Sequence, residues 1–96
     1  MTGTTRSSEG LDPRRRRLLY RAWHRGTREM DLIMGSFADA MIGELSEAEL
    51  DEFERLTDVP DGELYQWVAT GRSVPEAYDN SVFRRLRTFH ANGHKF

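Results

Sequence analysis

The chain has 96 residues and a net charge of −2, and its 38% hydrophobic and 31% charged residues are typical of one small soluble domain. It contains no cysteine, which excludes disulfide frameworks, thiolate metal sites and cysteine nucleophiles. No hydrophobic run approaches the roughly 20 residues that span a bilayer, and the N-terminus lacks the apolar stretch of a secretory signal, so we expect a cytoplasmic protein without a membrane partner.

The first predicted helix follows a small, polar segment, residues 1–11, which we expect to be a disordered tail. Asp12 and Pro13 favour a helix start, because aspartate caps helices and proline fits their first turn. The hydrophobic residues that follow share one helical face: Leu18, Leu19, Ala22 and Trp23. Gly26 is expected to end this helix in a left-handed conformation.

A second helix is predicted directly after Gly26. Thr27 is expected to cap it, with Glu29 and Asp31 in its first turn, where carboxylates interact favourably with the helix dipole. Its hydrophobic residues recur at helical spacing: Met30, Ile33, Met34, Phe37 and Met41. We interpret the methionines as core residues and not as a cofactor site.

Three further helices are predicted. Ser46 and Glu49 form the pattern of a capping box, and Leu50, Phe53 and Leu56 follow on one face. A fourth helix is expected to begin at Pro60–Asp61, to carry a hydrophobic stripe and to end at Gly71. A last helix is expected from around Pro75 to Asn92–Gly93, with these residues along one face: Tyr78, Val82, Leu86 and Phe89.

These patterns predict an all-α fold, a compact bundle of about five short helices, because no alternating strand pattern is present. We expect a helical domain over residues 12–92 and a C-terminal tail over 93–96. The predicted buried set is Leu19, Trp23, Ile33, Phe37, Phe53, Leu56, Leu64, Trp67, Val82 and Leu86.

The run Arg14–Arg17 raises the question of nucleic-acid binding. Four consecutive arginines point all round a helix, so we interpret them as a solvated collar. Replacing Arg14, Arg15 or Arg16 by Gln would then change stability by no more than about 0.5 kcal/mol each. The acidic middle of the chain, with eleven acids against one arginine over residues 31–64, would also repel phosphate.

No catalytic or metal centre is evident. His90 and His94 have the i, i+4 spacing that can bind zinc on a helix, but Asn92–Gly93 lies between them and no third ligand has supporting spacing. His24 is expected to be exposed and not catalytic. No glycine-rich phosphate loop and no Ser-His-acid order stand out. We therefore expect a protein that is not an enzyme and holds no metal or cofactor of its own.

The segment "RGTRE", residues 25–29, contains a glycine that a turn explains and flanking charges that a turn alone does not, since a plain turn would use Asn, Ser or Asp. Arg25 and Glu29 bracket Gly26, with Arg28 and Asp31 beside them, and at a two-helix corner these side chains would project outward. A glycine there allows close approach of another backbone, and charges of both signs favour specificity at an interface. The residues alone leave a binding role and a plain surface turn open.

The sequence around this turn resembles the succinate dehydrogenase assembly factors of the SdhE type. The family hallmark R-G-x-x-E is matched by Arg25, Gly26 and Glu29, and the upstream "RLLY" matches residues 17–20. Further matches are Asp31, Leu32, Phe37, Pro60, Asp61, Leu64 and Trp67. The resemblance covers about residues 11–90. Met30, Trp23 and His24 are small departures, and the C-terminal helix and tail match little.

The resemblance implies a bacterial, non-catalytic assembly factor with a small helical bundle. Its partner would be the flavoprotein subunit of succinate dehydrogenase or fumarate reductase, whose own histidine forms the covalent bond to the 8α-methyl carbon of FAD. FAD thus belongs to the partner. The implied partner-binding residues are Arg25, Gly26 and Glu29, with Arg17, Tyr20, Arg28 and Asp31 nearby. Two alternatives stay open: a nucleic-acid-binding regulator that uses the arginine-rich first helix, and a generic helical adaptor.

Overall fold

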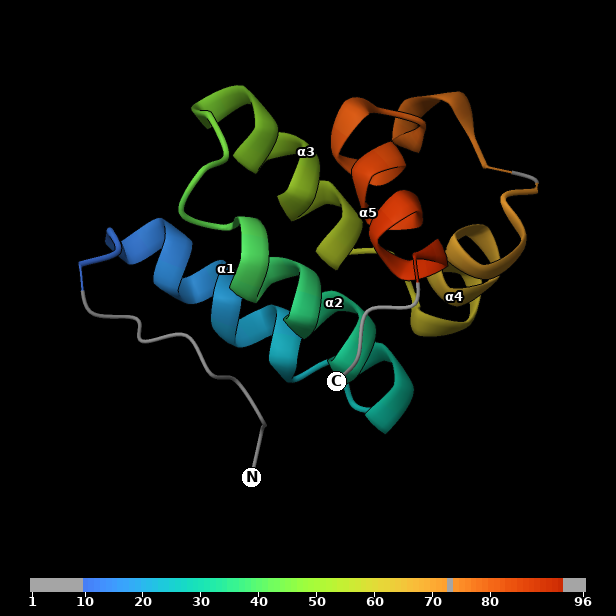
Figure 1. Cartoon of the computed structure of the whole chain (residues 1–96), viewed down its shortest axis with the longest axis horizontal. Helices are drawn as coiled ribbons and strands as arrows, with labels where there is room; N and C mark the ends of the chain where they lie inside the picture. The colour runs from blue at the N-terminus through green and yellow to red at the C-terminus, as the bar shows by residue number, and fades with distance from the viewer. Residues whose placement is uncertain (1–9, 73, 93–96) are drawn as a thin grey trace. The chain divides into compact units, whose positions relative to one another are not determined.

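The computed structural model describes residues 10–72 and 74–92, and over these residues the chain is helical and contains no strand (Figure 1). The elements are α1 (Pro13–Trp23), α2 (Arg28–Met41), α3 (Glu47–Thr57), α4 (Asp61–Thr70), the 3-10 helix η1 (Glu76–Tyr78) and α5 (Ser81–Ala91). The prediction of an all-α fold with about five helices is confirmed. The chain divides into two compact units, Met1–Leu45 and Ser46–Phe96.

The first unit is a helical hairpin in which α1 and α2 lie side by side and run in opposite directions (Figure 1). Both helices begin where the sequence predicts. The side chain of Asp12 accepts a hydrogen bond from the backbone N–H of Arg15, and that of Thr27 accepts one from Met30. The apolar stripes of the two helices are buried: Leu18, Leu19, Ala22, Trp23, Met30, Ile33, Met34, Phe37 and Ala38.

Trp23 anchors the hairpin next to its turn. A Cβ added to Gly35 would lie 2.2–2.5 Å from three atoms of the Trp23 indole, so the ring packs directly against the glycine backbone of α2. The indole Nε1–H donates to the Asp39 carboxylate at 3.1 Å, which satisfies the one polar group of a ring that is only 4% exposed. Gly35 therefore sets the distance between the two helices at this end.

The second unit contains α3, α4, η1 and α5, and α5 contacts both α3 and α4. The capping box of α3 is formed as predicted: Ser46 Oγ accepts from the backbone N–H of Glu49, and the Glu49 carboxylate accepts from that of Ser46 at 2.8 Å. Gly71 ends α4 with φ +70°, also as predicted. The buried apolar residues include Leu50, Phe53, Leu56, Val59, Leu64, Trp67, Val68, Val82, Phe83 and Leu86.

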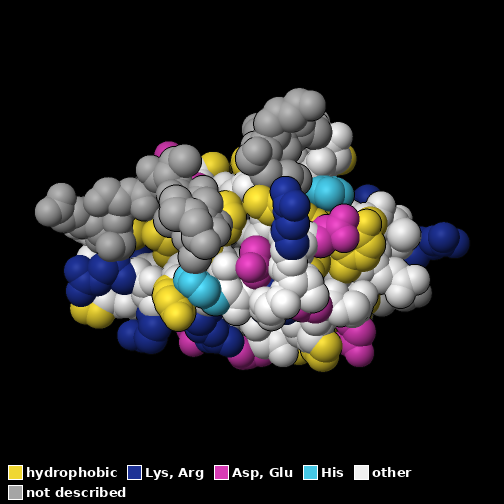
Figure 2. Space-filling view, turned by 90° about the horizontal axis from the view of Figure 1, so that it is seen from below, with side chains coloured by type: hydrophobic (Ala, Val, Ile, Leu, Met, Phe, Trp, Pro, Cys, Tyr) yellow, Lys and Arg dark blue, Asp and Glu magenta, His cyan; other side chains and the backbone are white. Residues whose placement is uncertain are grey.

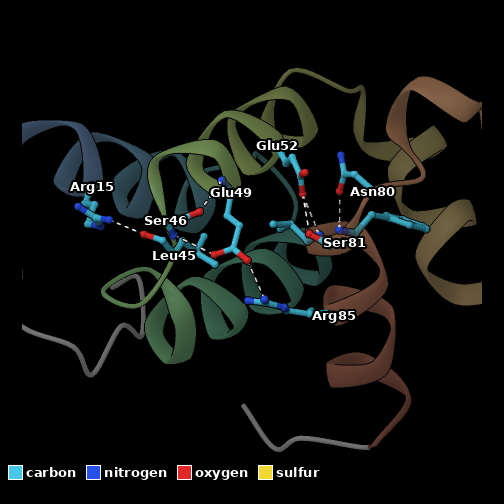
Figure 3. Close-up of polar contacts among 10 residues, drawn as sticks. Arg15, Leu45, Ser46, Glu49, Glu52, Asn80, Ser81 and Arg85 are labelled. Carbon is cyan, nitrogen blue, oxygen red and sulfur yellow. Dashed lines mark hydrogen bonds and ion pairs between the residues drawn. The ribbon is translucent and has the colours of Figure 1, made fainter.

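Two carboxylates of α3 reach α5 (Figure 3). Glu52 accepts hydrogen bonds from Ser81 Oγ at 3.0 Å and from the backbone N–H of Val82 at 3.1 Å, at the N-terminus of α5. Glu49 binds the Arg85 guanidinium at 2.7 Å. The hydrogen bond from the backbone N–H of Ser46, with the nearby Arg85 charge, holds the pKa of Glu49 below its ordinary value.

The prediction for the last helix is wrong at its start. Pro75 precedes only the short η1, and α5 begins at Ser81, where the side chain of Asn80 accepts from the backbone N–H of Phe83. Asparagine is a strong N-cap, and it governs the start here. Tyr78 consequently lies outside α5 and is half-buried, whereas Phe83, missed by the sequence pattern, is buried.

All ten residues of the predicted buried set are buried. Met41 is half-buried, unlike Met30 and Met34. Residues 1–9 of the predicted disordered tail and the predicted C-terminal tail, 93–96, lie outside the described residues, and the domain boundary at residue 12 stays a prediction. No helix within residues 10–72 and 74–92 has the length and hydropathy needed to cross a membrane.

Candidate functional site

The turn between α1 and α2 is the candidate site. α1 ends at Trp23, earlier than predicted, because His24 leaves the helical conformation with φ −126° and ψ 51°. Gly26 has a φ of +115°, which residues with a side chain rarely adopt. The backbone conformation of the turn therefore favours glycine at this position. A Cβ at Gly26 would meet nothing within 4 Å, which leaves open space above the turn.

Asp31 holds this turn from within α2. Its Oδ1 accepts hydrogen bonds from the backbone N–H of Arg25 at 2.6 Å and from that of Gly26 at 3.2 Å. The side chain is half-buried. The prediction that Asp31 projects outward is therefore wrong, because its carboxylate reaches back over the first turn of α2 to two consecutive backbone donors.

The other charged residues of the turn differ in exposure. Arg28 and Glu29, at the first two positions of α2, are exposed, as is Gly26. Arg25 is half-buried. Arg17 is exposed on α1. The structure thus brings the residues of the R-G-x-x-E pattern together on one corner of the hairpin, with both signs of charge.

Tyr20 and His24 form an exposed aromatic pair beside the turn. Their rings stack with centroids 3.8 Å apart and an angle of 18° between planes, and Tyr20 is 60% exposed. His24 Nδ1 lies 2.7 Å from the backbone oxygen of Tyr20, which as a carbonyl accepts the hydrogen bond. The expectation that His24 is exposed is confirmed. Its pairing with Tyr20 was missed; the available signal was the i, i+4 spacing of the two residues in a segment predicted to be helical.

Figure 2 shows one face of the molecule, seen from below the view of Figure 1. Basic side chains gather toward the left of Figure 2, beside an exposed histidine that lies against a hydrophobic side chain, with acidic groups nearby. Among the described residues, the exposed large hydrophobic side chains are those of Tyr20 and Tyr65. Tyrosine and arginine are residue types enriched at interface hot spots in general.

The arginine collar is not uniformly solvated. The Arg15 guanidinium donates from Nη2 to the Leu45 carbonyl oxygen (Figure 3). It also donates from Nε to the Ile42 carbonyl oxygen at 2.9 Å and from Nη1 to the Asp12 carboxylate at 2.6 Å. Its side chain is 19% exposed. The hydrogen bond from the Arg15 side chain also lowers the pKa of Asp12. Arg15 is thus a structural residue that joins α1 to the chain following α2, which corrects the collar interpretation and leaves one arginine fewer for phosphate.

Within the described part of the chain, no three His, Asp or Glu side chains are placed to hold a metal ion. His90 is half-buried on α5. His94, the other member of the predicted zinc-binding spacing, lies outside the described residues.

Comparisons with known proteins agree on one family. Residues 16–90 match the model of the family described as "Flavinator of succinate dehydrogenase". The chain is 41% identical over 84 residues to "Succinate dehydrogenase assembly factor 2, mitochondrial" of Scheffersomyces stipitis, covering 84% of this chain and 56% of the relative. It is 34% identical over 89 residues to the protein of the same name from Danio rerio, covering 91% and 56%.

A bacterial relative covers more of its own length. The chain is 36% identical over 80 residues to "FAD assembly factor SdhE" of Acetobacter pasteurianus, covering 83% of this chain and 73% of the relative. The chain spans only about half the length of the two mitochondrial relatives. No solved structure matches it.

Proposed function

The chain belongs to the family of succinate dehydrogenase flavinators, and from this premise we propose that it binds a flavoprotein subunit and promotes covalent attachment of FAD to it. The client would be the flavoprotein of succinate dehydrogenase or of a related fumarate reductase. A setting in the bacterial cytoplasm stays part of the proposal; the bacterial relative supports it. The observation that carries the proposal is the family match over residues 16–90, which includes the turn at residues 25–29.

The proposed contribution of this chain is binding and orientation. The flavin-linking histidine and the FAD both belong to the client, so this chain supplies no nucleophile and keeps no cofactor. Alignment of reacting groups alone is a large effect, since effective molarities reach about 10⁵ M or more in well-oriented model reactions. A factor that holds the client in its reactive geometry therefore needs no catalytic residue.

The proposed contact surface, which we call the docking corner, consists of Arg17, Tyr20, Arg25, Gly26, Arg28 and Glu29. Three properties support it. Glu29 and Arg28 are exposed and of opposite charge, which favours orientation of a partner. Tyr20 offers an exposed aromatic ring whose stacking on His24 limits its rotamers before binding. Gly26 leaves space for a partner's backbone.

The direct test is reconstitution. Purified client apoflavoprotein is incubated with FAD, with and without this chain, and covalent flavin is read as fluorescence of the client band in a denaturing gel. We expect the chain to accelerate the appearance of this band. An unchanged band would contradict the proposal, and binding without acceleration would favour the generic adaptor.

A matched pair of variants locates the contact surface. Tyr20 and Tyr65 are both exposed, at 60% and 40%, but only Tyr20 is in the docking corner. We expect Tyr20→Ala to weaken client binding and Tyr65→Ala to leave it near the wild-type level. Equal effects of the two changes would contradict the assignment of the docking corner.

A further inference from the structure

We infer that Asp31 is a positioning residue, one that fixes the backbone of the docking corner without contacting the client; this inference rests on the proposed function. A sequence pattern that places Asp31 beside the R-G-x-x-E motif suggests a direct contact. The structure gives its carboxylate a different partner, the backbone of the turn itself.

The geometry carries the inference. Asp31 is the fourth residue of α2, one turn inside the helix, and its Oδ1 faces the N–H groups of Arg25 and Gly26. The bond to the Arg25 N–H, at 2.6 Å, is the shorter of the two. One carboxylate oxygen thus fixes two consecutive peptide groups of a segment that is not helical.

This restraint matters most at Gly26. Gly26 has no Cβ and meets nothing within 4 Å at that position, so side-chain packing does not hold it. A glycine also has more accessible conformations than other residues. A turn that is ordered before binding avoids the entropy of ordering during binding, which increases affinity.

The two acids of this turn therefore have separate roles. Glu29 is exposed and available to a partner, whereas Asp31 is half-buried and engaged with the backbone. Loss of Asp31 would alter the position of Arg25 and the conformation of Gly26 while leaving the side chains of Arg28 and Glu29 in place.

The test compares Asp31→Ala, Asp31→Asn and the control Glu63→Ala in the full chain. Glu63 is an exposed acid in the first turn of α4, so its loss reproduces the change in charge near a helix N-terminus. Amide hydrogen exchange and ¹⁵N–¹H shifts of Arg25 and Gly26 report the turn itself. Titration of the client with each variant separates its affinity from the flavinylation rate at saturation.

For Asp31→Ala we expect faster exchange at both amides, a client affinity weaker by about tenfold or more, and a saturated rate close to wild type. Asp31→Asn keeps an acceptor oxygen and should recover most of the affinity. Glu63→Ala should change neither readout.

Two results would overturn the inference. If Asp31→Ala changes the two amides but binds the client at wild-type affinity, the turn needs no positioning. If it weakens binding while the amides keep their shifts and exchange rates, Asp31 contacts the client directly. Failure of the proposed function is distinguishable, because the wild-type chain itself would then not accelerate flavinylation, whatever the amides report.

Discussion

Replacing Gly26 by Ala tests whether the backbone of the turn requires a glycine, independently of any client. The added Cβ would meet no atom within 4 Å, so it creates no steric overlap with the rest of the chain. The penalty is conformational, since φ is +115° and an L-residue there is strained. A left-handed conformation is unfavourable by about 1–2 kcal/mol for a residue with a Cβ.

This magnitude is measurable by thermal melting. For a domain of this size, each kcal/mol lowers the melting temperature by about 4–8 °C. Gly62→Ala is the matched control, because Gly62 also has open space around its Cβ position but no positive φ, and alanine is favoured in helices. We expect Gly26→Ala to melt lower and Gly62→Ala to melt unchanged or slightly higher. Equal melting of Gly26→Ala and the wild type would refute the reasoning.

Three further changes test the structure of the two units. Gly35→Ala would drive a methyl group into the Trp23 indole, so urea unfolding should show a loss of about 1–3 kcal/mol despite the better helix propensity of alanine; an unchanged stability would contradict the packing. Arg15→Gln should lower the free energy of unfolding by about 1–3 kcal/mol because three hydrogen bonds are lost. Arg16→Gln, at the neighbouring exposed arginine, should change it by no more than about 0.5 kcal/mol, and equal effects would support the interpretation of all four arginines as solvated. Because the pKa of Glu49 is lowered in the folded protein, its carboxylate stabilises the fold at pH values above its ordinary pKa of 4.5, and this contribution is lost as the pH falls through the lowered pKa. Glu49→Gln should therefore reduce the drop in melting temperature on acidification. An identical pH profile of the two proteins would contradict this contribution.

Local signals explain why most of the fold was predictable. Asp12, Thr27 and Ser46 each precede an apolar helical stripe, and each caps its helix in the structure as such residues do in general. The resemblance carried by residues 25–29 also identified the family correctly. The start of α5 was mispredicted because Pro75 favours a helix start and begins only the short η1, whereas Asn80, whose capping role was not considered, caps α5.

Contacts between residues distant in sequence were not predictable in the same way. Arg15 looks like its three arginine neighbours in the sequence, and its bonds to carbonyl groups 27 and 30 residues away could not be read from that pattern. Asp31 looks like a first-turn acid that interacts with the helix dipole, yet its carboxylate holds the preceding turn. In both cases the residue type fits several roles, and the tertiary structure selects one.

The central claim, that an exposed corner of this hairpin promotes flavinylation, is tested most directly by Glu29→Ala in the reconstitution with client apoflavoprotein and FAD. Glu29 is exposed, so its loss removes only a favourable interaction with the helix dipole, some tenths to about 1 kcal/mol. Glu63→Ala is the control, an exposed acid at the equivalent end of α4. We predict that both variants stay folded and that only Glu29→Ala strongly reduces covalent flavin on the client. Wild-type flavinylation by a folded Glu29→Ala protein would show that the corner is only a turn.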